Sequence, residues 1–174
     1  MSDFWVFGYG SLIWNPGFPF LEKKRAHLSG LHRSLCVRSW VHRGTRDNPG
    51  LVLGLDEGGS CHGMAMRVPL AQQDEVLNYL RGRELVTNVY VECWRDIELE
   101  TGEMVSAVAY RVDRTHEQYA PGLSIEDQTE IVRVSQGGSG HNRDYVINTS
   151  LAMREAGIVD HTLEAISKRL TDNQ

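Results

Sequence analysis

Two glycines flank a single aromatic residue in the stretch Phe7-Gly8-Tyr9-Gly10-Ser11-Leu12, which directly follows a short apolar run at residues 5–7. Trp14-Asn15-Pro16 comes next and prevents a helix from forming, because proline lacks a backbone donor and clashes with the preceding turn. The stretch therefore predicts a strand that ends in a loop. Successive backbone N–H groups with little side-chain cover bind anions, so a carboxylate or a developing oxyanion is the ligand suggested. A plain structural turn is the alternative.

Two common glycine motifs do not fit this loop. A dinucleotide-binding fingerprint needs a third glycine that opens a helix, whereas Ile13 occupies that position and Pro16 follows it. A serine-hydrolase elbow needs Gly-x-Ser-x-Gly, whereas Ser11 stands in Tyr-Gly-Ser-Leu. The loop is thus a candidate for binding through its backbone.

Most of the chain up to residue 112 has the pattern of strands. The runs 28–31 and 34–38 follow, and Gly30 interrupts the first of them, which predicts one long strand with a bend or bulge. Residues 51–55 and 62–68 flank Asp56-Glu57-Gly58-Gly59, a turn signal at hairpin spacing. A second hairpin is expected where residues 88–99 and 105–112 flank Glu100-Thr101-Gly102-Glu103. Antiparallel pairing should therefore dominate.

One helix interrupts the strands and others end the chain. Pro69 suits a first helical turn, after which Val76, Leu77 and Leu80 share one face up to Gly82. Three later helices are expected, one after a capping box at Ser124-x-x-Asp127 that stops at Gly137, one over 142–156 closed by Gly157, and one capped by Asp160. This order indicates an α+β fold, a small mixed and mainly antiparallel β-barrel with outer helices. We expect a single domain over residues 1–174, with 160–174 as a C-terminal helical extension.

Charge and composition exclude several function classes. The net charge of −5 argues against a nucleic-acid partner, and the basic run Glu22-Lys23-Lys24-Arg25 is interpreted as a solvated surface turn. No apolar stretch approaches the roughly 18 residues of a membrane helix, and residues 1–5 show no basic signal-peptide region. We therefore expect a cytoplasmic protein with no membrane partner.

The cysteines and histidines give no sign of a metal site. Cys36, Cys61 and Cys93 are odd in number and widely spaced, so buried, inert thiols are expected rather than disulfides or a zinc site. Cys61 and His62 are neighbours on a predicted strand, where adjacent side chains point to opposite faces. We assign neither a metal nor a cofactor.

Two further residues are candidates for a site. Glu84 follows Gly82 and precedes the apolar pair Leu85-Val86, so its carboxylate either points into a cleft or forms a solvated surface pair with Arg83. Tyr145 lies one turn into a helix after the glycine-rich residues 137–140. Its hydroxyl could reach a site at that helix start, although a tyrosine there commonly serves only packing.

Taken together, these segments resemble the ChaC family of γ-glutamylcyclotransferases. Residues 5–14 are similar to the family's N-terminal signature nearly letter for letter, and Arg83-Glu84 resembles its catalytic segment. Weaker similarities lie at Gly30-x-x-Arg33, at Arg43-Gly44-Thr45 with Pro49-Gly50, and at Gly140-x-Asn142-x-x-Tyr145. The resemblance spans residues 5–151, and residues 160–174 lie outside it.

The resemblance implies a barrel with outer helices and an enzyme that cleaves glutathione into 5-oxoproline and cysteinylglycine without a cofactor. It assigns Glu84 as general acid/base. It assigns Gly8, Tyr9, Gly10, Ser11, Leu12 and Ile13 as the substrate-binding loop, and Tyr145 as a contact to the γ-glutamyl group. Two alternatives stay open: cyclisation of another γ-glutamyl amine, and a non-catalytic regulatory module that senses glutathione or acts beside a cation transporter.

Overall fold

The computed structural model describes residues 3–172. They divide into two compact units: residues 3–33 with 54–116, and residues 34–53 with 117–172. The expectation of a single domain stays a prediction. Within residues 3–172, every helix is too short or too polar to span a membrane, and the cytoplasmic location likewise stays a prediction.

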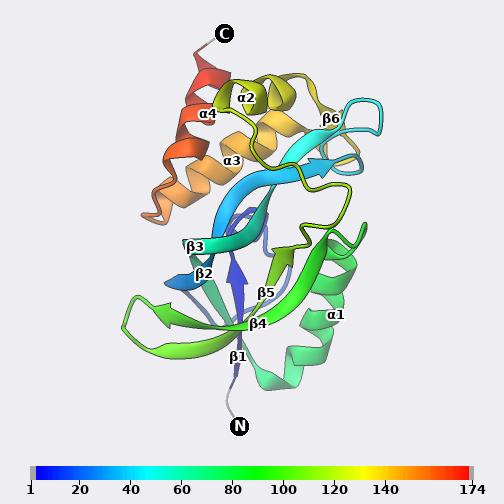
Figure 1. The fold of residues 1–174 in the computed structure, drawn as a ribbon. Coiled ribbons are helices and arrows are strands. Elements are labelled where there is room, and N and C mark those ends of the chain that lie inside the picture. The colour runs from blue at the N-terminus through cyan, green and yellow to red at the C-terminus, as the bar shows by residue number, and fades with distance from the viewer. Residues whose placement is uncertain (1–2, 173–174) are drawn as a thin grey trace. The chain divides into compact units, whose positions relative to one another are not determined.

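The first unit contains most of a closed five-stranded barrel, and residues 34–39 and 50–53 of the barrel strands belong to the second unit (Figure 1). Its strands, in the order in which they are bonded, are β1 (Phe4–Gly8), β3 (Gly50–Val68), β2 (Glu22–Ser39), β4 (Tyr90–Leu99) and β5 (Met104–Val112). The strand β1 pairs antiparallel with β3 and parallel with β5, and β4 and β5 form an antiparallel hairpin. The predicted α+β fold, a mixed and mainly antiparallel barrel with helices, is confirmed.

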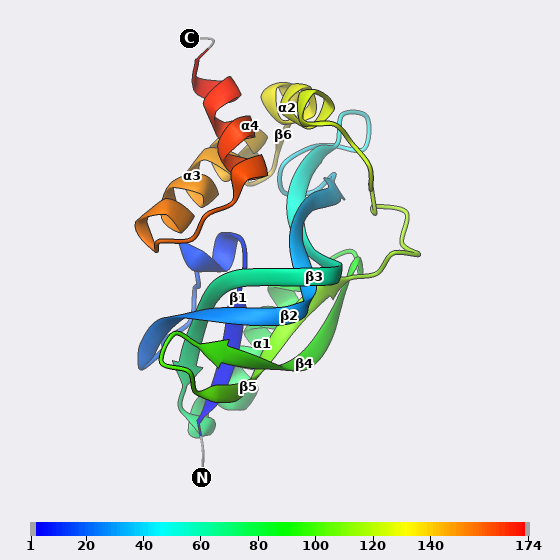
Figure 2. The same cartoon turned by 60° about the vertical axis from the view of Figure 1, so that its left-hand side comes forward.

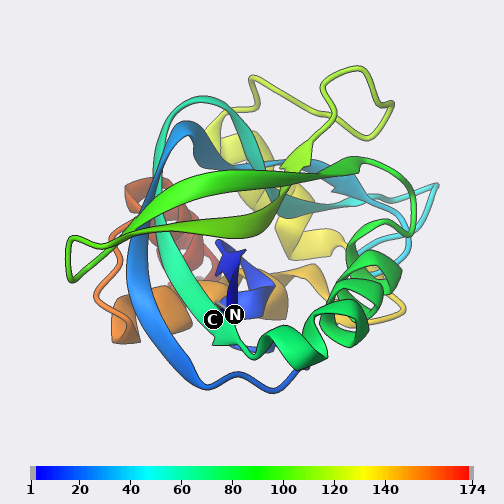
Figure 3. The same cartoon turned by 90° about the horizontal axis from the view of Figure 1, so that it is seen from below.

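The helix α1 (Gln73–Glu84) lies beside this barrel, as the view from below shows (Figure 3). A short 3₁₀ turn at Leu70–Gln72 leads into it after Pro69. Its predicted apolar face, formed by Val76, Leu77 and Leu80, is buried in one cluster with Val6 of β1. The other members of that cluster come from β1, β3, β5 and the segment after β1: Phe4, Leu12, Phe18, Met66, Val68, Val108 and Tyr110.

The second unit contains the remaining helices (Figure 2). These are α2 (Ile125–Val134), α3 (Asn142–Glu155) and α4 (His161–Thr171), with a small hairpin of β6 (Gln136–Gly137) and β7 (Gly140–His141) between the first two. The predicted caps are present, because Ser124 accepts a bond from the Asp127 N–H and Asp160 accepts one from Leu163. The helix α4 packs against both α2 and α3.

The prediction that α2 extends to Gly137 was wrong. The helix ends at Val134, Ser135 is extended, and Gln136-Gly137 pair with β7. The hairpin pairing takes up backbone groups that a longer helix would have used, and a sequence pattern does not reveal such a partner.

The long strand β2 confirms the predicted bend or bulge at Gly30. It also shows that the surface turn predicted for residues 22–25 was wrong. Gly30 has φ +88, a left-handed conformation that suits glycine, and the strand continues on both sides. Residues 22–25, however, are strand rather than a surface turn. Glu22 pairs with Arg67 of β3, so cross-strand ion pairs accommodate the charged run.

The predicted hairpin at Asp56-Glu57-Gly58-Gly59 was also wrong, because β3 runs through these residues as one strand. Gly58 and Gly59 do adopt positive φ, +95 and +62, but the chain bends there without reversing. His32 of β2 holds the bend, with its Nδ1 3.1 Å from the Gly58 carbonyl oxygen. Residues 56–59 therefore form a bend in β3, next to β2, rather than a hairpin turn.

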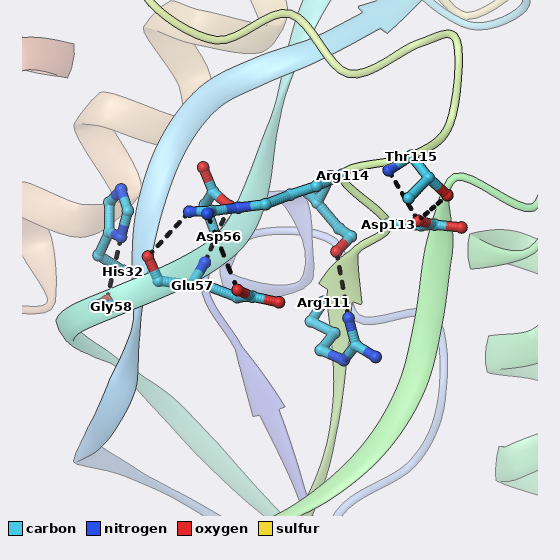
Figure 4. A network of polar contacts seen from close by, with 9 residues as sticks. His32, Asp56, Glu57, Gly58, Arg111, Asp113, Arg114 and Thr115 are labelled. Carbon is cyan, nitrogen blue, oxygen red and sulfur yellow. Dashed lines mark hydrogen bonds and ion pairs between the residues drawn. The ribbon is translucent and has the colours of Figure 1, made fainter.

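A buried carboxylate fixes the chain just beyond β5 (Figure 4). The Asp56 side chain on β3 is 8% exposed and accepts a bond of 2.7 Å from Arg114 Nε. The Arg114 Nη2 donates to the Glu57 carbonyl, and Asp113 accepts two bonds from Thr115. The first residues after the last barrel strand are thereby attached to β3.

We predict that Arg114→Met lowers the free energy of unfolding by about 1–3 kcal/mol, because a buried carboxylate loses its charged donor. Arg111→Met is the matched control. That guanidinium donates to the carbonyl of its neighbour Val112, and its loss should change stability by less than about 0.5 kcal/mol. Urea denaturation of both variants measures the difference, and equal effects would contradict the assigned role of Asp56.

Candidate functional site

The 8–13 loop (Gly8–Ile13) leaves the end of β1 and closes on itself. Ser11–Ile13 form a single 3₁₀ turn, in which the Ile13 N–H donates to the Gly10 carbonyl at 3.0 Å. A short turn therefore forms where the sequence predicted no helix, and it ends before Pro16. The Leu12 and Ile13 side chains are buried. What the loop can offer a ligand is therefore mainly its backbone and the half-buried Ser11 hydroxyl.

Cationic side chains fix the loop from outside. Arg33 of β2 donates through Nε to the Tyr9 carbonyl at 2.6 Å, and Lys23 of the same strand donates to the Ile13 carbonyl. In a trans peptide the C=O and N–H point in opposite directions. The Gly10 N–H therefore points away from Arg33, and the cations orient the loop's peptide groups. Burial lowers the pKa of the Lys23 ammonium.

Glu84 is the last residue of α1, which corrects the predicted helix stop at Gly82. The helix continues through Gly82, and the Leu85 N–H still bonds to the Arg81 carbonyl at 3.0 Å. Gly82 has open space around it and adopts ordinary helical geometry. The sequence predicted a helix terminus at Gly82 because glycine is common where helices end. A glycine alone does not show whether the helical hydrogen bonds continue beyond it.

The Glu84 carboxylate is largely withdrawn from water, with 15% of its side chain exposed. Burial raises the pKa of this carboxyl, and the nearby Arg83 charge opposes that rise. The Arg83 Nε lies 3.5 Å from a Glu84 oxygen. This burial argues against the solvated surface pair, and whether the Glu84 carboxylate points into a cleft stays a prediction.

Arg83 connects Glu84 to the loop. Its Nη2 donates to the Ser11 hydroxyl at 2.9 Å, and its Nη1 donates to the Asn15 carbonyl at 2.5 Å. The structure thus brings together two segments that are about 70 residues apart in sequence. Sequence reasoning assigned no role to Arg83. Its adjacency to Glu84 was the available signal, but the acceptors on residues 11–16 were not visible.

A second set of polar side chains, Arg81, Glu92 and Tyr110, is bonded together near the end of α1. The Tyr110 hydroxyl of β5 donates to Glu92 at 3.0 Å, and Arg81 makes two bonds to the same carboxylate. The hydrogen bonds from Arg81 are the main cause that lowers the pKa of Glu92. Burial raises the pKa of Tyr110, and the charges of Glu92 and Glu84 raise it further, so this phenol stays protonated.

Tyr145 belongs to the second unit and is buried there, 7% exposed. Its hydroxyl accepts a bond from the Leu53 N–H at 3.0 Å, and the Arg43 guanidinium lies 5.6 Å from the ring centroid. Asn142, one turn earlier, pairs with both backbone groups of Leu51. These contacts fix the start of α3 to β3, as the packing alternative expected. A contact to substrate stays a prediction.

The other chemistry-bearing side chains are dispersed. Within residues 3–172, the His, Cys, Asp and Glu side chains form no group of three close enough to hold a metal ion. Cys36 and Cys61 are buried and Cys93 is half-buried, and each of the three is a thiol rather than half of a disulfide. The candidate site is therefore the 8–13 loop with Glu84 and Arg83.

The fold is that of the γ-glutamylcyclotransferases. A crystal structure of a γ-glutamyl cyclotransferase specific to glutathione from yeast matches with a TM-score of 0.89 at 22% identity, covering 100% of this chain and 98% of that one. A structure described as a γ-glutamyl cyclotransferase matches with a TM-score of 0.58 at 15% identity, covering 95% and 86%.

Comparison of sequences places the chain in a narrower group than comparison of folds does. The profile of the ChaC-like protein family matches residues 4–173. The glutathione-specific γ-glutamylcyclotransferase of Escherichia coli (strain K12) is 33% identical over 174 residues, which cover 97% of this chain and 75% of the relative. The glutathione-specific γ-glutamylcyclotransferase 1 of Danio rerio is 32% identical over 157 residues, covering 88% and 80%. The chain belongs to the ChaC-like family, and the resemblance drawn from residues 5–14 is confirmed.

We predict that Gly82→Ala raises the free energy of unfolding by about 0.5–1 kcal/mol, since alanine restricts the unfolded chain and favours the helix. A β-carbon at this position would meet no atom within 4 Å. Thermal denaturation measures the change. A loss of stability would show that this part of α1 needs the freedom of glycine, as a helix terminus does.

We predict that Glu84 makes the wild-type protein less stable as pH rises. Its carboxyl has a raised pKa in the folded state, so the folded protein holds the proton more tightly than the unfolded chain does. Stability is therefore lost between the ordinary glutamate pKa and the raised one. Glu84→Gln should gain stability relative to wild type above this window and show no such gain below it. A pH-independent difference would contradict the burial of a titrating carboxylate.

Proposed function

We propose that this protein is a glutathione-specific γ-glutamylcyclotransferase, which converts glutathione into 5-oxoproline and cysteinylglycine. The observation that carries the proposal is the buried carboxylate of Glu84, joined through Arg83 to the glycine-rich 8–13 loop. The relatives named above supply the substrate, since their names specify glutathione. Membership in the ChaC-like family supports carrying that substrate over.

The substrate carries its own nucleophile. In a γ-glutamyl compound the α-amino nitrogen can fold back onto the γ-carbonyl carbon and close a five-membered ring. The enzyme has to hold the bent conformer, because a tethered nucleophile already has a high effective concentration. Neither water nor a covalent enzyme intermediate is needed for the atoms to balance.

Glu84 performs the proton transfers in this proposal. Its carboxylate takes a proton from the α-ammonium, and the freed amine attacks the γ-carbonyl carbon. The resulting carboxylic acid then gives the proton to the cysteinyl nitrogen as the C–N bond breaks. Glu84, again a carboxylate, takes the second proton from the former α-nitrogen and passes it to the released amine. The products are the lactam 5-oxoproline and cysteinylglycine with a protonated amine, and Glu84 returns to its starting state. A raised pKa suits this exchange, because it makes the carboxylate a stronger base and makes its protonated form easier to reach.

The 8–13 loop supplies the anion-binding groups. The Gly8, Tyr9, Gly10, Ser11, Leu12 and Ile13 backbone would hold the α-carboxylate, or the carbonyl oxygen as its negative charge develops. The carbonyls of Tyr9 and Ile13 are already bonded to cations, which supports a loop whose donors are set before substrate arrives. Tyr145 is proposed as a further contact to the γ-glutamyl group.

We predict that Glu84→Gln abolishes nearly all turnover of glutathione, because an amide cannot exchange these protons. The measurement is mass spectrometry of 5-oxoproline and cysteinylglycine after incubation of the purified protein with glutathione. Glu75→Gln is the matched control, since Glu75 is exposed on the same helix. It should retain wild-type turnover.

Each outcome has a distinct meaning. Stoichiometric products from wild type and from Glu75→Gln, with none from a folded Glu84→Gln, support the proposal. Full activity of Glu84→Gln would remove Glu84 from the mechanism. No product from folded wild type would contradict glutathione as substrate, and a screen of γ-glutamyl amines would then separate another cyclotransferase from a binding module.

A further inference from the structure

We propose that Arg83 is a positioning residue that holds Glu84 and the 8–13 loop at a fixed separation. The proposal rests on the proposed function, because it assigns Arg83 a part in the same reaction. Arg83 itself contacts neither reacting atom in the mechanism above. It acts through the loop on one side and through Glu84 on the other.

The contacts use almost the whole guanidinium. Nη1 donates to the carbonyls of Asn15 and Pro16, at 2.5 and 3.2 Å, and lies 3.2 Å from the Tyr79 hydroxyl. Nη2 donates to the Ser11 hydroxyl, and Nε faces Glu84 at 3.5 Å. The Arg83 side chain is 19% exposed, so these bonds compete little with water. A surface arginine would not find this set of acceptors on a neighbouring segment.

The geometry requires arginine in particular. A guanidinium is a planar fork with donors on three nitrogens, so it can bond to the loop and face a carboxylate at once. A lysine in the same place has one nitrogen and could keep the charge but not the bridge.

The contacts of Arg83 set the distance between Glu84 and the 8–13 loop, and the reaction depends on that distance. Glu84 must reach the substrate nitrogens while the loop's N–H groups hold an oxygen of the same molecule. Glu84 lies at the end of α1, and the loop begins at the end of β1. Arg83 precedes Glu84 on α1 and donates to Ser11 in the loop, so it links the two. A misplacement of about 1 Å in such a constellation can lower a rate by roughly 100-fold.

Arg83 also supplies charge at Glu84. The titratable and charged groups near this carboxyl are Arg83 on its own helix and Tyr110 on β5, with Glu92 of β4 and Arg81 of α1 bonded behind Tyr110. Tyr110 stays neutral and adds no charge. The Arg83 cation lowers the pKa of Glu84 and thereby opposes the effect of burial. Removal of the charge should raise that pKa.

The test compares Arg83→Met, Arg83→Lys and the control Arg95→Met, which removes an exposed arginine elsewhere in the same unit. Arg83→Met should lower kcat for glutathione by about 10- to 100-fold and move the acid limb of the pH profile of kcat/KM to higher pH. Arg83→Lys should lose kcat but keep the acid limb near that of wild type. Arg95→Met should match wild type in both.

A second readout does not depend on turnover. Hydrogen exchange measured by mass spectrometry should be faster over residues 9–16 in both Arg83 variants, and unchanged there in Arg95→Met. If wild type turns over no glutathione, the proposed function fails, while hydrogen exchange still decides whether Arg83 holds the loop.

Wild-type kcat, acid limb and loop exchange in Arg83→Met would overturn the proposal. A loss of kcat together with a general rise in exchange across the chain would show instead that Arg83→Met has unfolded. If Arg83→Met does not fold, Arg83→Lys decides by the same measurements: lost kcat with local exchange supports positioning, and full activity refutes it.

Discussion

The barrel depends on the insertion of β1 between β3 and β5. This five-residue strand is buried along its whole length, and it bonds to β3 on one side and to β5, in parallel, on the other. Closure of this kind leaves the barrel without open edges. It also forces the chain to leave the barrel at Gly8, among buried side chains and next to the cluster that holds α1. The position of the loop is therefore a consequence of barrel closure, and the position of Glu84 is a consequence of the same buried cluster.

The site combines a rigid backbone with a carboxylate kept from water. Arg33 and Lys23 bind loop carbonyls, and Arg83 binds the segment just beyond. These bonds turn peptide dipoles in a fixed direction before any ligand arrives, which is the arrangement that stabilises developing negative charge at low cost. Glu84 is subject to two opposing influences, burial and the Arg83 cation. Burial is the larger influence, so the pKa of the carboxyl is raised, which suits a group proposed to act as both base and acid.

Much of the fold could be predicted because periodic burial is a local signal. The β4–β5 hairpin, the apolar face of α1 and the caps at Ser124 and Asp160 were all recognisable from spacing and residue type. The errors share a cause. Gly58-Gly59, Gly82 and Gly137 each suggested a break that the structure does not place there. The strand β3 and the helix α1 continue through their glycines, and α2 ends before Gly137, which pairs with β7. Glycine permits a conformation, while its neighbours in space determine which one is adopted.

The sequence by itself determined the family, through residues 5–14, and with it the expectation of a carboxylate at Glu84 and an anion-binding loop. These were accessible because the loop's chemistry is written in consecutive residues. Only the tertiary structure decided that Glu84 is buried, that Arg83 joins it to the loop, and that Tyr110 and Glu92 lie beneath the same helix end. Desolvation and hydrogen bonding depend on what lies within a few ångströms in space, and residues 11 and 83 acquire that proximity only when the barrel closes and α1 packs against it.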